Sequence, residues 1–253
     1  PALPGAVGPL KQLADAASGL GSLSLDTADS AGVVREVPLL WSDGTQLYPG
    51  LSIETLRLAL GVTTPVALGD TRGDGTLEAL KLGPFTVPTT ASGDIVLYDK
   101  RPDPREVISA GALLGDDYRS LADQVSGRIV LVGTSASGLL DLHATPLSPA
   151  IAGVRIHAAV IDQIVSGSYL TRADWVQGLE ILVFVIAGAL LVPVVLRLGP
   201  LAGLALAVVL IAAMIGGAFA GFALKGWLLD ATLPAIGALV TYGAMVYAQF
   251  SLT

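Results

Sequence analysis

The sequence contains no cysteine, and its last third contains almost no charge. The absence of cysteine excludes a disulfide framework and thiolate chemistry. Only 14% of the residues are charged, against about 25% in a typical soluble domain, while 53% are hydrophobic. The net charge is −7, so the chain lacks the basic footprint that nucleic-acid phosphates require. These deficits argue against nucleic acid as a partner and favour the lipid bilayer.

The few charges that the chain has are unevenly distributed. Residues 1–174 hold 12 of the 14 Lys and Arg and 19 of the 21 Asp and Glu, whereas residues 175–253 hold only two of each sign. This division predicts an acidic, water-facing domain over residues 1–174 and a membrane domain over residues 175–253.

Three apolar segments of the membrane domain are long enough to cross a bilayer, because a spanning helix needs about 20 such residues. The expected spans cover residues 175–196, 199–224 and 227–250. Their short connections predict three antiparallel transmembrane helices. The size of the acidic domain and the odd number of spans place residues 1–174 outside the cytoplasm and the C-terminus inside.

Two features of these spans bear on packing. Ala213, Gly217 and Gly221 recur at four-residue intervals in the second span. Small residues allow helices in lipid to approach closely, so this face is a candidate helix–helix contact, although small residues are also common in spans generally. Glu180 stands near the outer end of the first span, where we expect it to reach the interface or to pair rather than to serve transport.

Residues 1–174 mix strand-like and helical patterns, which predicts an α/β domain. The strand-like run 33–41 leads to an Asp43-Gly44 turn signal, so we expect a hairpin there. A second turn signal stands at Asp74-Gly75. The apolar, β-branched run 128–132 predicts a short buried strand.

Apolar residues at helical spacing predict two helices in the same domain. One covers residues 51–60 and places Ile53, Leu56 and Leu60 on a single face. The other covers residues 153–165, with Ile156, Val160 and Ile164 on a single face, and Gly167 can terminate it.

The loop from Gly133 to Gly138 (GTSASG) follows the expected strand 128–132. Its backbone N–H groups could face an anion, or its hydroxyls could simply cap the backbone. It is neither a phosphate-binding Walker loop nor a nucleophile elbow of the G-x-S-x-G type. A hydrolase would have to use Ser135, Asp141 and His143. In such a triad the Asp orients the His, which acts as the general base. Asp141 and His143 are only two residues apart, which makes this alignment difficult, so no catalytic residue is expected.

His143 and His157 are the only histidines. Together with Asp141 they match no standard metal-ligand spacing, so neither a metal nor a cofactor is expected. The candidate ligand-binding residues are Thr134, Ser135, Asp141, His143, Thr145 and His157. For His157 the alternative is a packed, hydrogen-bonded residue near the start of a helix.

Two ordered sets of motifs resemble one family. The downstream set is GTSASG at 133–138, Asp141-Leu142, Thr145-Pro146 and AGVRIHAAVID at 152–162. The upstream set is DSAGVVREVPL at 29–39 and PGLSIETLR at 49–57. Over residues 19–172 these motifs resemble the second type of CHASE domain, a cyclase/histidine-kinase-associated sensory extracellular domain. Ala31 stands where the family usually has a second Asp, and Gly50 stands where it has Ser.

The resemblance implies an extracytoplasmic sensor domain followed by three spans. Family members usually end in a cytoplasmic adenylate/guanylate cyclase, protein kinase or histidine kinase, so the resemblance implies no enzyme on this chain and such an output in its parent. They also begin with a span and a further stretch of sensor domain. We therefore expect residues 1–174 to be the C-terminal part of an incomplete domain.

Two functions remain open on the sequence. The first is the sensory input and membrane-anchor module of a bacterial signalling protein in the plasma (inner) membrane, which responds to an unknown small-molecule or protein signal. The second is a structural or assembly subunit of a membrane complex that reuses the sensor fold. In either case we expect a homo-oligomer, or a partner chain that completes the sensor domain. A transporter is disfavoured because the spans hold too few polar groups for a pathway.

Overall fold

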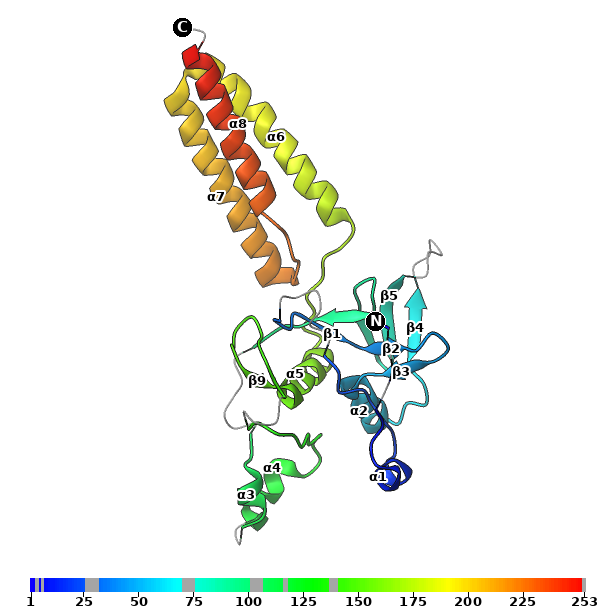
Figure 1. The fold of residues 1–253 in the computed structure, drawn as a ribbon. Coiled ribbons are helices and arrows are strands. Elements are labelled where there is room, and N and C mark those ends of the chain that lie inside the picture. Colours follow the sequence, from blue (N-terminus) through cyan, green and yellow to red (C-terminus); the bar gives the residue numbers. More distant parts are fainter. Residues whose placement is uncertain are drawn as a thin grey trace. The chain divides into compact units, whose positions relative to one another are not determined.

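Figure 1 shows the fold of the chain as a computed structural model. The structure describes residues 1–2, 5, 7–25, 32–69, 76–100, 107–115, 118–136 and 141–251. Their contacts divide the chain into two compact units, Pro1–Tyr169 and Leu170–Thr253. The predicted turn at Asp74-Gly75, the family departure at Ala31 and the loop residues Ser137 and Gly138 lie outside the described residues.

The first unit combines short strands with helices, as the sequence predicts. Its strands are β1 (Glu36–Pro38), β2 (Leu40–Ser42), β3 (Leu47–Pro49), β4 (Val66–Gly69), β5 (Leu77–Leu82), β6 (Phe85–Pro88), β7 (Asp94–Val96), β8 (Leu142–His143) and β9 (Ile151–Ala152). Its helices are α1 (Lys11–Ala16), α2 (Leu51–Ala59), α3 (Ala110–Leu113), the 3-10 helix η2 (Tyr118–Leu121), α4 (Ala122–Val125) and α5 (Gly153–Ser166). Among the described residues, these strands pair antiparallel: β1 with β7, β2 with β3, β8 with β9, and β5 between β4 and β6.

The predicted hairpin is confirmed as the β2–β3 pair. Asp43 Oδ1 accepts the backbone N–H groups of Thr45 at 2.8 Å and Gln46 at 2.7 Å, which closes the turn. Gly44 has a φ of +91°, which a residue with a Cβ adopts only under strain. The hydrogen bond from Gln46 is the main reason that the pKa of the Asp43 carboxyl lies far below its ordinary value.

Both predicted helices of the first unit are confirmed, as α2 and α5. On α5, Ile156, Val160 and Ile164 are all buried, and Gly167 ends the helix in the left-handed conformation. These residues pack with β-strand residues such as Leu80 and Ile95 in one hydrophobic cluster. Burial of side chains of this size stabilises a fold by about 1.5–3 kcal/mol each.

The face predicted for α2 is only partly correct. Ile53 and Leu56 are buried in the same cluster, but Leu60 is 40% exposed. Leu60 is the C-cap residue, where the chain leaves the helix and turns through Gly61. A helical face extends only as far as the helix itself, so the last expected member of this face points to solvent.

The predicted buried strand at residues 128–132 is wrong. The segment is not a strand, and Val130 and Val132 are 52% and 91% exposed, while Leu131 packs against the core. Among the described residues, no backbone hydrogen bond involves residues 129–136. The pattern is that of a buried strand, but a strand needs a paired neighbour, and the described residues supply none here.

The side chain of Gln163 forms hydrogen bonds with backbone groups at the end of β7. Gln163 of α5 is almost fully buried; its Oε1 accepts the N–H of Tyr98 at 3.0 Å, and its Nε2 donates to the carbonyl of Val96 at 2.9 Å. An amide carries both a donor and an acceptor, so it can replace the backbone of a neighbouring strand. Helix α5 is thereby tied to the end of β7 by two hydrogen bonds.

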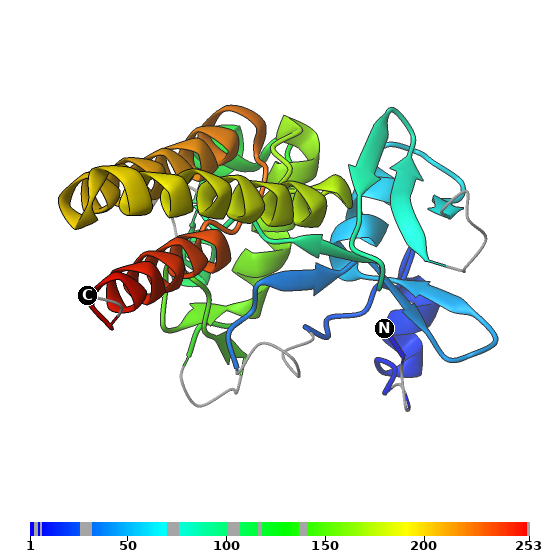
Figure 2. The ribbon, with the colours of Figure 1, turned by 90° about the horizontal axis from the view of Figure 1, so that it is seen from above.

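The second unit contains α6 (Trp175–Leu198), α7 (Pro200–Lys225) and α8 (Thr232–Ser251). The three helices lie side by side in both views (Figures 1 and 2), and each is long and apolar enough to cross a membrane. The third helix begins at Thr232, five residues after the expected start of the third span at Trp227. Trp227 instead forms an isolated parallel β-bridge with Thr171, which donates to the carbonyl of Gly226 and accepts the N–H of Leu228.

Small residues mediate the packing of the three helices. A Cβ added at Gly203 of α7 would collide with Val195 of α6, and one added at Gly237 of α8 would collide with Phe184 of α6. Ala187, Leu191, Ala207 and Ala238 are buried in the same contact. By contrast, a Cβ at Gly217 would meet no atom within 4 Å, and Ala213 is exposed. The candidate contact face at Ala213 and Gly217 is thus uncovered within the described chain, while Gly221 packs against Leu229.

Candidate functional site

The structure brings three of the six candidate ligand-binding residues together, since Asp141 and His143 both act electrostatically on His157. Asp141 and His143 are neighbours at β8, with His143 Nε2 3.5 Å from Asp141 Oδ1. Thr145 exchanges backbone hydrogen bonds with Ser148 and closes a tight turn. Thr134 is exposed. Among the described residues, no group of three or more His, Cys, Asp or Glu is arranged to hold a metal ion.

His157 is a packed residue of the core, which was the alternative for this side chain. It is 2% exposed, its Nε2 lies 3.3 Å from the carbonyl oxygen of Leu23, and its Nδ1 lies 3.1 Å from Ser52 Oγ. A carbonyl oxygen only accepts, so Nε2 carries a proton. The Ser52 hydroxyl also donates to the carbonyl oxygen of His157 at 3.2 Å. The ring therefore joins α5, α2 and the N-terminal segment.

Burial lowers the pKa of His157 below its ordinary value of about 6.5. The unfolded chain then binds a proton that the folded chain excludes, so the free energy of unfolding should fall as the pH drops below about 6.5. Thermal unfolding of the detergent-solubilised chain between pH 7.5 and pH 5 measures this effect. His157→Gln should weaken the dependence, whereas His143→Gln should retain it. An unchanged slope in His157→Gln would contradict the assignment.

Ser135 lines a pocket of the first unit. This pocket has a volume of about 330 Å³ and is lined by Asp99, Lys100, Ser135, Leu142, Leu147, Ser148, Ala150, Ile151, Ala152 and Arg155. The residues come from the segment after β7, the loop after residue 132, the β8–β9 hairpin and the first turn of α5. The volume is at the lower end of the range for small-molecule sites.

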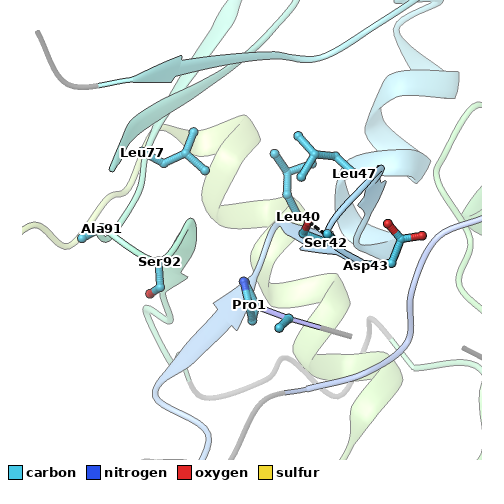
Figure 3. A pocket seen from close by; sticks show the side chains of 10 residues that line it. Pro1, Leu40, Ser42, Asp43, Leu47, Leu77, Ala91 and Ser92 are labelled. Atoms are coloured by element: carbon cyan, nitrogen blue, oxygen red, sulfur yellow. Dashed lines mark hydrogen bonds between the residues drawn. The ribbon is translucent and has the colours of Figure 1, made fainter. Parts of the chain in front are cut away.

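A larger pocket of about 440 Å³ is poorer in recognition groups (Figure 3). Leu40, Leu47 and Leu77 line it together with Ser92. Asp43 is its one charged side chain among the described lining residues, and that carboxylate is already engaged by Thr45, Gln46 and Tyr48. The smaller pocket is therefore the better candidate for a ligand site.

Apart from the two pockets, a cluster of polar contacts lies in the second unit, at the start of the membrane helices. Thr171 forms two backbone hydrogen bonds with the α7–α8 connection, accepting from Leu228 at 2.9 Å and donating to Gly226 at 3.0 Å. Arg172 pairs with Glu180 of α6 at 2.8 Å and also donates to the carbonyl of Leu228 at 3.3 Å. We call these residues, together with Trp175, Trp227 and Asp230, the juxtamembrane clamp.

The clamp continues through Glu180 to the start of α8. Glu180 Oε1 accepts the backbone N–H of Asp230 at 2.8 Å, and the Asp230 carboxylate accepts the N–H of Thr232 in the first turn of α8. That second bond is the main reason that the pKa of Asp230 lies below its usual value. The rings of Trp175 and Trp227 meet edge to face, 5.0 Å between centroids. The expectation that Glu180 pairs is therefore confirmed.

Lys100, Arg155 and Arg172 were missed as functional candidates. Lys100 and Arg155 are 55 positions apart in the sequence and meet only through the fold, so no spacing rule identifies them. Arg172 carried a signal that could have been read: it is a cation just before an apolar segment that contains one acid, Glu180. A lone acid in a span calls for a partner nearby.

Comparison with known proteins identifies one family. No curated protein and no solved structure matches the chain. The family model described as CHASE2 domain matches residues 3–190, which include all but the first two residues of the first unit and most of α6. CHASE2 is a sensory rather than a catalytic domain, as the motifs around residues 133–162 imply. The match spans well over half of the sequence, and the chain belongs to the CHASE2 domain family.

Proposed function

We propose that the chain is the extracytoplasmic input and membrane-anchor module of a bacterial signalling protein. A sensory domain followed by three candidate membrane helices supports this role. The first unit lies outside the cytoplasm, three antiparallel spans cross the plasma membrane, and the C-terminus lies inside. A cytoplasmic cyclase or kinase in the parent protein receives the signal.

The juxtamembrane clamp is the observation that carries the proposal. Residues 170–174, which directly follow the sensory unit in sequence, are hydrogen-bonded through Thr171 and Arg172 to the α7–α8 connection and to α6. A displacement of this segment is therefore delivered to α6 and to the start of α8 at once. Two states of the sensory unit can then favour two packings of the spans, which is the condition for coupling.

A fusion that reports output tests this coupling. A cyclase is fused after Thr253, and four flexible residues are inserted after Gly167, between α5 and the clamp. We expect the insertion to change basal cyclase activity, because slack now separates α5 from Thr171. The control inserts the same residues after the exposed Gly115. Unchanged cyclase activity, with normal amounts of the fusion protein in the membrane, would show that the spans serve only as a membrane anchor.

The topology is tested separately from the coupling. The chain has no native cysteine, so a single introduced cysteine gives an unambiguous label. In intact cells, a cysteine at Ser92 should react with a membrane-impermeant thiol reagent, and one at Thr253 should react only after lysis. Labelling at Thr253 alone would reverse the proposed orientation.

One observation favours the second function, a structural or assembly subunit. The segment 129–136 presents apolar side chains and makes no backbone hydrogen bond to the described part of the chain, and such a segment readily pairs with another strand. We infer that a strand from a second copy or a partner chain completes the domain. Amide hydrogens of residues 129–132 should then exchange rapidly in the purified chain and slowly in native membranes. Rapid exchange in both settings would count against a completing strand.

A further inference from the structure

We propose that the 330 Å³ pocket beside α5 binds a small organic anion with a single carboxylate group and a short apolar body. The proposal deepens the sensory function proposed above, since it names the chemical class of the signal. Among the described lining residues, Lys100 and Arg155 are cationic and Asp99 is acidic. The described part of the lining thus carries one net positive charge, which matches a monoanion.

The three charged side chains of the pocket differ in their interaction partners. Asp99 Oδ2 accepts the backbone N–H of Leu147 at 2.9 Å and so fixes the turn that forms one wall. Lys100 Nζ lies 3.2 Å from Asp162 and 5.3 Å from the centre of the Tyr98 ring. The side chain of Arg155 forms no hydrogen bond or ion pair with any other described residue. Its planar guanidinium is therefore available for a bidentate carboxylate.

The neutral part of the lining argues against phosphate. Leu142, Leu147 and Ile151 supply apolar surface, while Ser135 and Ser148 supply hydroxyl groups. The Ser148 hydroxyl donates to the carbonyl of Ala150 at 3.2 Å and remains an acceptor. A dianionic phosphate would meet the Asp99 carboxylate and leave the apolar wall uncovered. A branched short-chain carboxylate satisfies both parts of the lining.

Calorimetric titration of the full chain in detergent with isovalerate tests the proposal. Isovalerate should bind saturably, while neutral isovaleramide and inorganic phosphate should bind at least about tenfold more weakly. Arg155→Gln should weaken isovalerate binding by about tenfold or more, because it removes a charge-assisted, bidentate contact. Arg119→Gln, an equivalent change at a residue outside the pocket, should leave binding unchanged.

The outcomes separate this proposal from the sensory function. Binding of isovalerate that survives Arg155→Gln, or equal binding of isovaleramide, overturns the carboxylate site. So does the absence of binding by isovalerate. None of these results alters the insertion experiment on the cyclase fusion, which reports coupling without any ligand. Conversely, an uncoupled fusion would refute the sensory function and leave the measured binding in place.

Discussion

Gly203→Leu is expected to destabilise the packing of the three membrane helices severely. A Cβ at this position of α7 would collide with Val195 Cγ2 and lie 3.3 Å from Tyr242 Cε2, so helices from both sides occupy the space. Val195 is fully buried and has little freedom to move. Overpacking commonly costs about 1–3 kcal/mol, and a whole leucine side chain should reach or exceed the upper end. Thermal unfolding and protease resistance in detergent measure the loss.

Gly217→Leu is the matched control on the same helix. It adds the same side chain at a position where a Cβ meets nothing within 4 Å, and leucine is the better helix former by about 1 kcal/mol. The purified chain should therefore be unchanged or slightly more stable. Equal damage by the two substitutions would refute the observed packing. A change in cyclase output with Gly217→Leu alone would indicate that the Ala213–Gly217 face contacts another chain.

Removal of the Glu180 carboxylate is expected to release the juxtamembrane clamp. Glu180→Leu removes the acceptor of the Asp230 N–H and leaves the Arg172 guanidinium, among the described residues, with the carbonyl of Leu228 as its sole hydrogen-bond acceptor, and the Glu180 side chain is only 12% exposed. Loss of one partner from a partly buried ion pair should cost about 1–3 kcal/mol here. Glu180→Gln keeps an acceptor oxygen for the Asp230 N–H and should cost less.

A double-mutant cycle in lipid nanodiscs tests whether the pair acts as a unit. Arg172→Ala and Glu180→Ala should each lower the thermal stability, and the double variant should be little worse than either single variant. Strict additivity would show that the two groups do not interact. In the cyclase fusion, both single variants should shift basal output in the same direction as the insertion after Gly167. A shift with no loss of stability would point to a different route of coupling.

Sequence patterns within a short segment were enough to predict those elements that are stabilised by residues of the same segment. The Asp43-Gly44 turn supplies its own hydrogen bonds, so the β2–β3 hairpin follows from a few residues. Helix α5 follows from apolar spacing together with Gly167, which ends the helix in the left-handed conformation. The run 128–132 shows where this reasoning fails. Its composition predicts burial, but Val132 is exposed because burial depends on a paired strand elsewhere.

The candidate sites were harder to predict because their members are far apart in sequence. Ser135 was singled out from its loop, but the charges that accompany it, at Lys100 and Arg155, come from other segments. His157 seemed a candidate ligand because histidine is rare in this chain, yet its two nitrogens are used by Leu23 and Ser52. The hydrogen bond between Glu180 and Asp230 forms only because the connection after α7 brings Asp230 back beside α6.

The Glu180–Asp230 hydrogen bond joins residues 50 positions apart, and this separation sets an order on biogenesis. When α6 leaves the ribosome, its carboxylate can meet Arg172, but the N–H of Asp230 has not yet been synthesised. Helix α6 therefore has one carboxylate oxygen without its protein partner until α7 has been made and the chain has returned toward Arg172. Among these three helices, the start of the third thus completes the contacts of the first.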